Sequence, residues 1–174
     1  KKAGKKMNTL ELEKMANEIR KSILTEVHCA KCGHPGGSLS AADMMTYLYF
    51  EEMNIDPSRP DMAERDRFVL SKGHVAPAYY AALAHRGYFP TEDLKTLRKV
   101  GSYLQGHPDM KHTPGVDMSS GSLGQGISAA VGMALSAKLS GDDYRVYTML
   151  GDGEIQEGQV WEAAMFAGSR KLDN

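Results

Sequence analysis

Apolar residues in the first part of the chain recur every three or four positions, which is the spacing of an amphipathic helix. They are Leu10, Leu12, Met15, Ala16, Ile19, Ile23, Leu24 and Val27. The pattern predicts a helix from Thr9 to Ala30, and Glu11 and Glu13 give it an acidic first turn, which favours a helix start. The stretch 33–38 contains glycine and proline and is expected to break this helix. A second helix is expected over about 41–53.

Beyond residue 60, short apolar runs alternate with alanine-rich segments. The runs 67–71 and 146–150 are rich in strand-forming residues, and each ends at a glycine turn, so they predict two buried strands. Helices are expected over 76–84 and 127–139, in a short segment from Thr91, and after the second strand. Strands that alternate with helices predict the α/β class, with a mostly parallel sheet flanked by helices.

The pattern also indicates where the domain is incomplete and where it is irregular. Two strands are too few for a stable sheet, and a third strand is expected to start at about 171–174. We therefore expect residues 7–174 to form the front part of a larger domain, preceded by a short tail at 1–6. From Gly101 to Gly126 regular periodicity fails, and irregular chain of this length is more often functional than idle.

Composition and charge narrow the classes of function. The 174 residues carry a net charge of −1, which gives no electrostatic argument for nucleic-acid binding. No apolar run approaches the ~20 residues of a membrane span, and no secretory signal precedes the domain. The two cysteines, Cys29 and Cys32, cannot form a disulfide framework, so we expect a cytoplasmic protein. Their spacing fits a redox pair or half a zinc site, although two small apolar residues at a helix end are the simpler interpretation.

The second predicted strand leads into Gly151-Asp152-Gly153, and a helical pattern follows. This order places a ligand site at the carboxyl end of a parallel strand. Glycine lets the backbone approach a ligand closely, whereas a bare carboxylate would repel a diphosphate unless Mg²⁺ or Ca²⁺ lay between them. The triplet therefore indicates either a metal-bridged diphosphate at Asp152 or an ordinary turn after a buried strand.

Histidines beside glycine form a second group of candidates. His34, His74 and His107 each follow a glycine near the end of a predicted element, where imidazole and backbone can approach a ligand together. Imidazoles can bind phosphate when they are charged, and they can transfer protons to and from a hydroxyl or carbonyl group. We therefore expect the three loops to contribute to one site.

Two further segments have more than one interpretation. The amides of 121–126 can hold an anion or let the loop pack against a cofactor ring, but the spacing GxxGxG disfavours a nicotinamide dinucleotide. Near the end of the sequence, stabilisation of a helix dipole is the simplest explanation of Glu154. Glu157 and Glu162 lie beside Trp161 and small residues, where a buried carboxylate is more plausible.

Together these segments resemble transketolases, from about Leu10 onward, and specifically the amino-terminal part of the thiamine-diphosphate-binding (PP) domain. Each alone would be a weak signal, whereas the set in the family order is specific. The matching segments are Gly33-His34-Pro35-Gly36-Gly37, Ser71-Lys72-Gly73-His74, Gly106-His107-Pro108, Thr113-Pro114-Gly115-Val116-Asp117, Gly121-Ser122-Leu123-Gly124-Gln125-Gly126, Gly151-Asp152-Gly153-Glu154, Glu157-Gly158 and Trp161-Glu162-Ala163.

The resemblance implies thiamine diphosphate and a divalent cation, Mg²⁺ or Ca²⁺, as cofactors. By position, Asp152 would be a metal ligand, and the glycines on either side of it, Gly151 and Gly153, would lie in the cofactor site. His74 would contact the diphosphate. The cofactor rings would be lined by Gly121 and Leu123.

The same resemblance implies transfer of a two-carbon ketol unit between sugar phosphates. His34 and His107 would be the catalytic residues, facing the hydroxyl and carbonyl oxygens of the substrate. Glu157 and Glu162 would join a cluster of carboxylates between two cofactors at a dimer interface.

The sequence departs from the family in ways that imply a partner. Ser122 stands where the family usually has proline, the family's asparagine metal ligand lies beyond Asn174, and the pyrimidine-binding domain is absent. We expect that domain, or a C-terminal transketolase subunit, to complete a homodimer or heterotetramer, because the short opening resembles split transketolases. Alternatives are a dihydroxyacetone synthase, an unusual-sugar transketolase, or a non-catalytic module that retains the fold.

Overall fold

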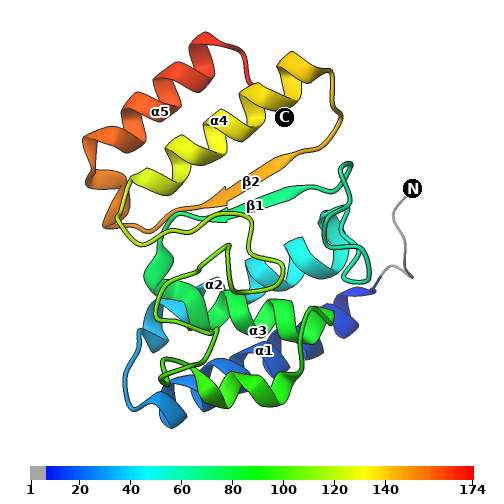
Figure 1. The fold of residues 1–174 in the computed structure, drawn as a ribbon, viewed down its shortest axis with the longest axis vertical. Coiled ribbons are helices and arrows are strands. Elements are labelled where there is room, and N and C mark those ends of the chain that lie inside the picture. Colours follow the sequence, from blue (N-terminus) through cyan, green and yellow to red (C-terminus); the bar gives the residue numbers. More distant parts are fainter. Residues whose placement is uncertain (1–6) are drawn as a thin grey trace.

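The computed structural model describes residues 7–174, in which a small parallel sheet separates two groups of helices (Figure 1). The sheet pairs β1 (Arg67–Leu70) with β2 (Val146–Met149), in the register Arg67↔Val146 to Leu70↔Met149. One side carries α1 (Thr9–Ala30), α2 (Pro35–Tyr47) and α3 (Ala76–Arg86); the other carries α4 (Gln125–Ser140) and α5 (Gly158–Ser169). The predicted α/β class and parallel sheet are confirmed.

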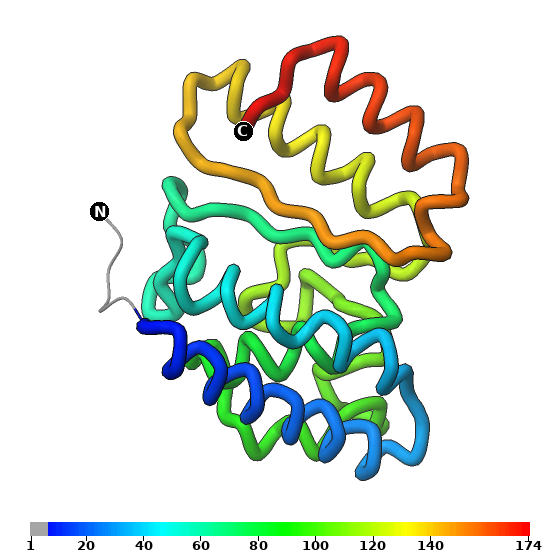
Figure 2. Tube along the Cα trace, turned by 180° about the vertical axis from the view of Figure 1, so that it is seen from behind, coloured from blue at the N-terminus to red at the C-terminus, as the bar shows by residue number. Residues whose placement is uncertain are grey.

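Short turns of other helix types complete the described elements. A π-helical turn, η1, covers Leu48–Glu52, and 3₁₀ turns cover η2 (Gly73–Val75), η3 (Thr91–Thr96) and η4 (Glu154–Gln156). Between η3 and α4 the chain has no helix or strand, as predicted for 101–126. This segment leads from the helices on one side of the sheet to the end of β1 (Figure 2).

Helix α1 begins where the sequence pattern predicts. The Asn8 side chain accepts a hydrogen bond from the Glu11 backbone N–H (2.9 Å), and the Glu11 carboxylate accepts one from the Asn8 backbone N–H (2.8 Å). This reciprocal capping satisfies two amides that the first turn would leave without partners. The helix then buries Ile19 and Ile23 against α2 and α3.

Helix α2 begins at Pro35 rather than near residue 41, so the predicted break at 33–38 is too long. Proline at the first helical position fixes φ and has no N–H to leave unpaired, and it therefore starts this helix instead of breaking it. Gly37 is needed for packing, because a Cβ there would lie 3.0 Å from Cγ2 of Val75. The glycines that indicated a loop are part of the first helical turn.

The core lies between the sheet and α1–α3. Its aromatic centre is a cluster of Tyr49, Phe68 and Tyr79, with ring centroids 5.1–6.0 Å apart. Asp117 ties the irregular segment to β1, since it accepts a hydrogen bond from the Phe68 amide (2.8 Å) and pairs with Arg65. None of the helices found in residues 7–174 has both the length and the apolar character needed to cross a membrane.

Candidate functional site

The carboxyl ends of β1 and β2 lead directly into two of the segments selected from the sequence. The Ser71 amide donates to the Met149 carbonyl (3.0 Å), which extends the parallel pairing one residue past β1. The turn at Lys72–His74 and the turn at 151–153 therefore start side by side. This is the edge of a parallel sheet at which ligands bind in α/β proteins.

Glycine allows two other parts of the backbone to reach this edge. A Cβ on Gly73 would lie 2.8 Å from Cα of Gly121, and a Cβ on Gly126 would lie 2.6 Å from Cα of Ser71. Only glycine fits at these two close backbone contacts. The segment 121–126 is therefore held against the end of β1, where the Ser120 hydroxyl also donates to the Leu70 carbonyl (2.6 Å).

The three histidines of the predicted site lie together, as expected. The rings of His34 and His74 meet edge to face, with centroids 5.0 Å apart. His107 lies against Gly121, where a Cβ would be 3.1 Å from its Cδ2 atom. The Tyr80 hydroxyl holds the loop of His107 by donating to the carbonyls of Gln105 (2.9 Å) and His107 (3.0 Å). Segments far apart in the sequence thus bring the three imidazoles to one edge.

The environment of these histidines favours the neutral imidazole. Burial lowers the pKa of His74, and the neighbouring His34 and Lys72 lower it further. Burial also lowers the pKa of His107, with Arg98 and His34 as smaller causes. Both rings are therefore neutral at neutral pH, and this favours proton transfer or neutral hydrogen bonding over attraction of phosphate by a charged imidazole.

Glu154 was misinterpreted from the sequence as a residue that stabilises a helix dipole. It lies in η4, ahead of α5, and is only 1% exposed. Its carboxylate accepts hydrogen bonds from the Ser71 hydroxyl (2.5 Å), the Gly124 amide (3.0 Å) and the Gly151 amide (2.9 Å). It therefore joins β1, α4 and the 151–153 turn. The signal available in the sequence was its place three residues after Gly151, from which a carboxylate can reach back to the amide of the turn.

Asp152, the predicted metal ligand, is exposed and makes no hydrogen bond or ion pair within residues 7–174. No group of three or more side chains that could hold a metal ion occurs in that part of the chain, so the role of Asp152 as a metal ligand stays a prediction. Gly153 leaves open space, because a Cβ on it would have nothing within 4 Å. Lys72, to which the sequence pattern assigned no role, lies against Gly151 and is buried.

The remaining predicted residues lie at the border of this edge. Leu123 is 37% exposed in the loop before α4. Glu157 is exposed but close to that loop, since a Cβ on Gly124 would lie 3.2 Å from its Cβ. Glu162 is exposed on α5. The expected burial of Glu157 and Glu162 does not occur within the single chain, and their place at a dimer interface stays a prediction.

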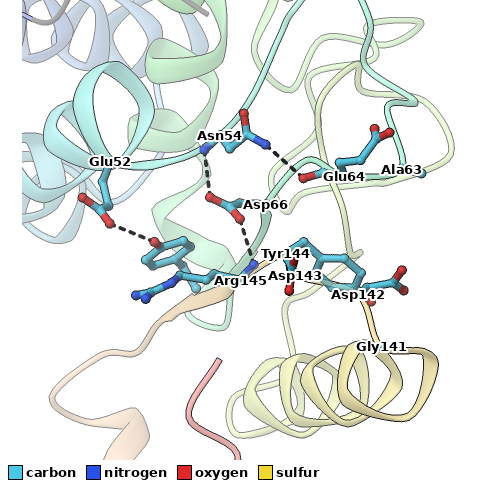
Figure 3. A pocket seen from close by; sticks show the side chains of 11 residues that line it. Glu52, Asn54, Ala63, Glu64, Asp66, Gly141, Asp142, Asp143, Tyr144 and Arg145 are labelled. Carbon is cyan, nitrogen blue, oxygen red and sulfur yellow. Dashed lines mark hydrogen bonds between the residues drawn. The ribbon is translucent and has the colours of Figure 1, made fainter. Parts of the chain in front are cut away.

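A cavity of about 720 Å³ lies at the opposite, amino ends of the strands (Figure 3). Asp66 accepts hydrogen bonds there from the Asn54 amide (2.8 Å) and the Arg145 amide (2.8 Å), and Glu52 accepts one from the Tyr147 hydroxyl (3.2 Å). These polar groups join the π-turn to the start of β2. The cavity is therefore lined by structural contacts, and the candidate site remains at the carboxyl ends.

Comparison with known proteins identifies the family of this chain. Residues 12–174 match the family described as transketolase, thiamine diphosphate binding domain. The chain is 55% identical over 165 residues to the 6-deoxy-6-sulfo-D-fructose transketolase subunit of Clostridium sp. (strain MSTE9), covering 95% of this chain and 60% of that subunit. It is 45% identical over 168 residues to one subunit of the apulose-4-phosphate transketolase of Phocaeicola vulgatus, covering 97% of this chain and 59% of that subunit.

Solved structures give the same assignment. The transketolase of Campylobacter jejuni superposes with a TM-score of 0.89 at 37% identity, covering 97% of this chain and 28% of that one. The transketolase of Leishmania mexicana superposes with a TM-score of 0.85 at 40% identity, covering 94% of this chain and 26% of that one. The chain thus spans about 60% of the related subunits and about a quarter of the one-chain enzymes. It belongs to the transketolase family, as part of its thiamine-diphosphate-binding domain.

Proposed function

We propose that the protein transfers a two-carbon ketol unit from a ketose phosphate to an aldose phosphate, with thiamine diphosphate and a divalent cation, Mg²⁺ or Ca²⁺. The observation that carries the proposal is the convergence of His34, His74 and His107 with Asp152 at the carboxyl ends of β1 and β2. The chain spans only part of its relatives, so this activity is proposed for the complete protein with its partner.

The residues at this edge fit the cofactor. Asp152 is an exposed carboxylate without a partner in residues 7–174, beside backbone that glycine keeps open. Such a carboxylate suits a cation that also binds phosphate oxygens. Asp152 would hold the metal, His74 would contact the diphosphate, and Gly121 and Leu123 would line the rings. When bound, thiamine diphosphate supplies the carbon nucleophile of the reaction.

The chain's own part in the chemistry falls to His34 and His107. Both side chains are exposed beside the backbone that is expected to bind the cofactor. The His107 ring is nevertheless partly desolvated, which lowers its pKa and keeps it neutral. A neutral imidazole can take a proton from a substrate hydroxyl and return it to an oxygen that becomes negative. Positioned acid–base groups contribute about 10²–10⁴-fold to a rate.

A partner is needed for the complete site, and α5 offers a surface for it. This helix leaves Trp161 (59%), Met165 (67%) and Phe166 (41%) exposed, and a contiguous apolar face of this kind marks a protein contact. Glu157 and Glu162 border the same helix. We propose that this face meets a second copy or a C-terminal transketolase subunit, which also brings the pyrimidine-binding domain.

A specific observation also favours an unusual-sugar transketolase as a second candidate. The two related subunits are named for 6-deoxy-6-sulfo-D-fructose and for apulose 4-phosphate, and the first is 55% identical to this chain. The two candidates share their chemistry at C1–C2 of the ketose and differ in the group at the other end of the sugar.

The test is a coupled assay with the complete protein and its partner subunit. Thiamine diphosphate, Mg²⁺ and an aldose acceptor are supplied with each of three donors: fructose 6-phosphate, 6-deoxy-6-sulfofructose and apulose 4-phosphate. Turnover that requires both the cofactor and Mg²⁺ supports ketol transfer, and the preferred donor separates the two candidates. Residues 1–174 alone should give no turnover above a heat-treated control. Cofactor binding without turnover on any donor would favour a non-catalytic module.

A further inference from the structure

Lys72 is a buried cation to which the function proposed above gives no role. It lies two residues after the end of β1 and is 8% exposed, and its side chain makes no hydrogen bond or ion pair within residues 7–174. No other lysine or arginine of those residues is buried to this degree. Its stem is buried while its Nζ atom keeps contact with solvent, so the ammonium group is available to a ligand at this edge.

The position of Lys72 directs attention to the diphosphate site. Its side chain lies along the turn that carries Asp152, because a Cβ on Gly151 would be 3.5 Å from Cδ of Lys72. Its charge also reaches His74, whose pKa it helps to lower after burial and His34. The lysine side chain therefore lies beside the turn that carries the expected metal ligand and acts electrostatically on the residue expected to contact the diphosphate.

The nearest buried acid is not available to neutralise Lys72. The two carboxylate oxygens of Glu154 accept hydrogen bonds from Ser71, Gly124 and Gly151, and Lys72 donates none of them. The Lys72 ammonium group and the Glu154 carboxylate thus lie in the same region without forming an ion pair. The ammonium group can therefore pair with an anionic ligand.

The charges at this edge also call for a cation. A diphosphate is strongly negative, and Asp152 adds a further negative charge. His74 and His107 are neutral at neutral pH, since burial lowers the pKa of both. Arg98 influences His107 but is not among the groups that act on His74. Lys72 is therefore a fixed positive charge at the edge where the diphosphate is expected.

We propose that the Lys72 ammonium group forms an ion pair with the diphosphate of thiamine diphosphate, as a second positive charge beside the cation held by Asp152. This inference rests on the proposed function. It assigns Lys72 to cofactor binding rather than to the chemistry of the sugar.

The first measurement uses the cofactor-free protein with its partner subunit. The variant Lys72→Met keeps the length of the apolar stem and removes the charge. Because the ammonium group has no protein partner before the cofactor binds, its removal should not lower the thermal midpoint of the cofactor-free protein. The matched control is Lys14→Met, at an exposed position on α1, which should leave the midpoint unchanged. A large fall in the midpoint of Lys72→Met would show that the lysine has a structural partner and would overturn the proposal.

The second measurement is calorimetric affinity at constant Mg²⁺ for thiamine diphosphate, thiamine and inorganic diphosphate. Charge-assisted hydrogen bonds of this kind correspond to about 10- to 100-fold in affinity. Lys72→Met should weaken both diphosphate ligands by that factor and leave thiamine unchanged, while Lys72→Arg should recover part of the loss. Lys14→Met should match the wild type with every ligand.

The outcomes separate this inference from the function on which it rests. If the wild type binds thiamine diphosphate and Lys72→Met binds it equally well, the lysine is not a ligand and the inference alone fails. If Lys72→Met weakens thiamine as much as thiamine diphosphate, the lysine acts through folding or ring packing, and the inference again fails. If the wild type does not bind thiamine diphosphate with its partner present, the proposed function fails and the inference fails with it.

Discussion

The two ends of the β1–β2 sheet carry similar kinds of residue but use them differently. At the amino end, Asp66 bonds to the amides of Asn54 and Arg145, so its carboxylate is fully engaged (Figure 3). At the carboxyl end, the side chains of Asp152 and Lys72 have no hydrogen-bond or ion-pair partner within residues 7–174. The amino end also has the more obvious cavity.

The difference separates two criteria for a binding site, unmet bonding capacity and the volume of a cavity, because they select opposite ends of this sheet. Buried polar groups in folded proteins are almost always paired. The Lys72 ammonium group, which has no protein partner and lies on the same edge as the exposed Asp152, is available to a ligand, whereas the bonded groups of the amino end are not. Substitutions at one end of the sheet that leave the other end unchanged test this distinction directly.

The largest effect is expected from the histidines of the carboxyl end. His34→Ala and His107→Ala should each lower kcat/KM by about 10²–10⁴-fold and leave thiamine diphosphate affinity nearly intact, because they are expected to act on the sugar. The measurement is steady-state turnover of the complete enzyme. His112, exposed and paired with Asp109, supplies the control variant His112→Ala, which should keep full activity. Full turnover of both variants on every ketose would refute their catalytic role.

Glu154 is the exception at the carboxyl end, since its carboxylate is as fully bonded as that of Asp66. Glu154→Ala would leave the Ser71 hydroxyl and the amides of Gly124 and Gly151 buried without their acceptor. At about 1 kcal/mol for each lost bond, the free energy of unfolding should fall by about 3 kcal/mol. Urea unfolding of the complete protein measures it. Glu13→Ala, at an exposed site on α1, should stay within about 0.5 kcal/mol of the wild type.

Asp152 and Asp66 form a matched pair for the two ends. Asp152→Ala should weaken Mg²⁺-dependent binding of thiamine diphosphate by at least about 10–100-fold, since loss of even a group behind a metal ligand costs that much. Asp66→Ala should leave this affinity unchanged but reduce stability, because two backbone amides lose their acceptor. Calorimetry with and without Mg²⁺ gives the affinities. Equal affinity in wild type and Asp152→Ala would remove the basis for a metal site here.

The smallest effect concerns Glu26, which is 0% exposed and whose two carboxylate oxygens have no hydrogen-bond partner within the described chain. Burial raises its pKa well above 4.5. The folded state therefore holds a proton that the unfolded state releases, so stability should decline as pH rises from about 4.5 through the raised folded pKa. Tyr80 is the titratable group that interacts with it.

Replacing Glu26 should remove this pH dependence. Glu26→Met should raise the free energy of unfolding at neutral pH by about 1 kcal/mol, and the gain should shrink toward pH 4.5. Urea unfolding between pH 4.5 and 8 tests this, with Glu13→Met as the exposed control on the same helix. A gain that is the same at every pH would mean that the Glu26 carboxyl keeps its ordinary pKa.

Much of the fold follows from the sequence because periodicity reports which face of an element is buried. It located α1, α4 and both strands, and motif order identified the family. The start of α2 was misplaced, because proline and glycine favour both a turn and a helix start, and only the contact with Val75 decides between them.

The site was predicted less completely, for a different physical reason. Residue type and motif indicated the histidines and Asp152, but a residue's partners depend on segments far away in the sequence. Nothing local shows that Ser71 and Gly124 meet at Glu154, so its burial was missed. Nor does the sequence show that the Lys72 stem is buried beside the 151–153 turn while its ammonium group makes no hydrogen bond to Glu154.

The bonds around Glu154 also have a consequence for how the site opens. The amides of Gly124 and Gly151 donate to Glu154, and the amide of Ile127 donates to the Ser71 oxygen (3.1 Å), which in turn donates to Glu154. These amides come from separate segments. Those of Gly124 and Gly151 share the Glu154 carboxylate as acceptor, and that of Ile127 is linked to it through the Ser71 hydroxyl. Hydrogen exchange with solvent should therefore occur at all of them in a single opening event. A ligand that binds any one of these segments would slow amide hydrogen exchange in the others. The carboxyl edge of the sheet would then open as one cooperative unit.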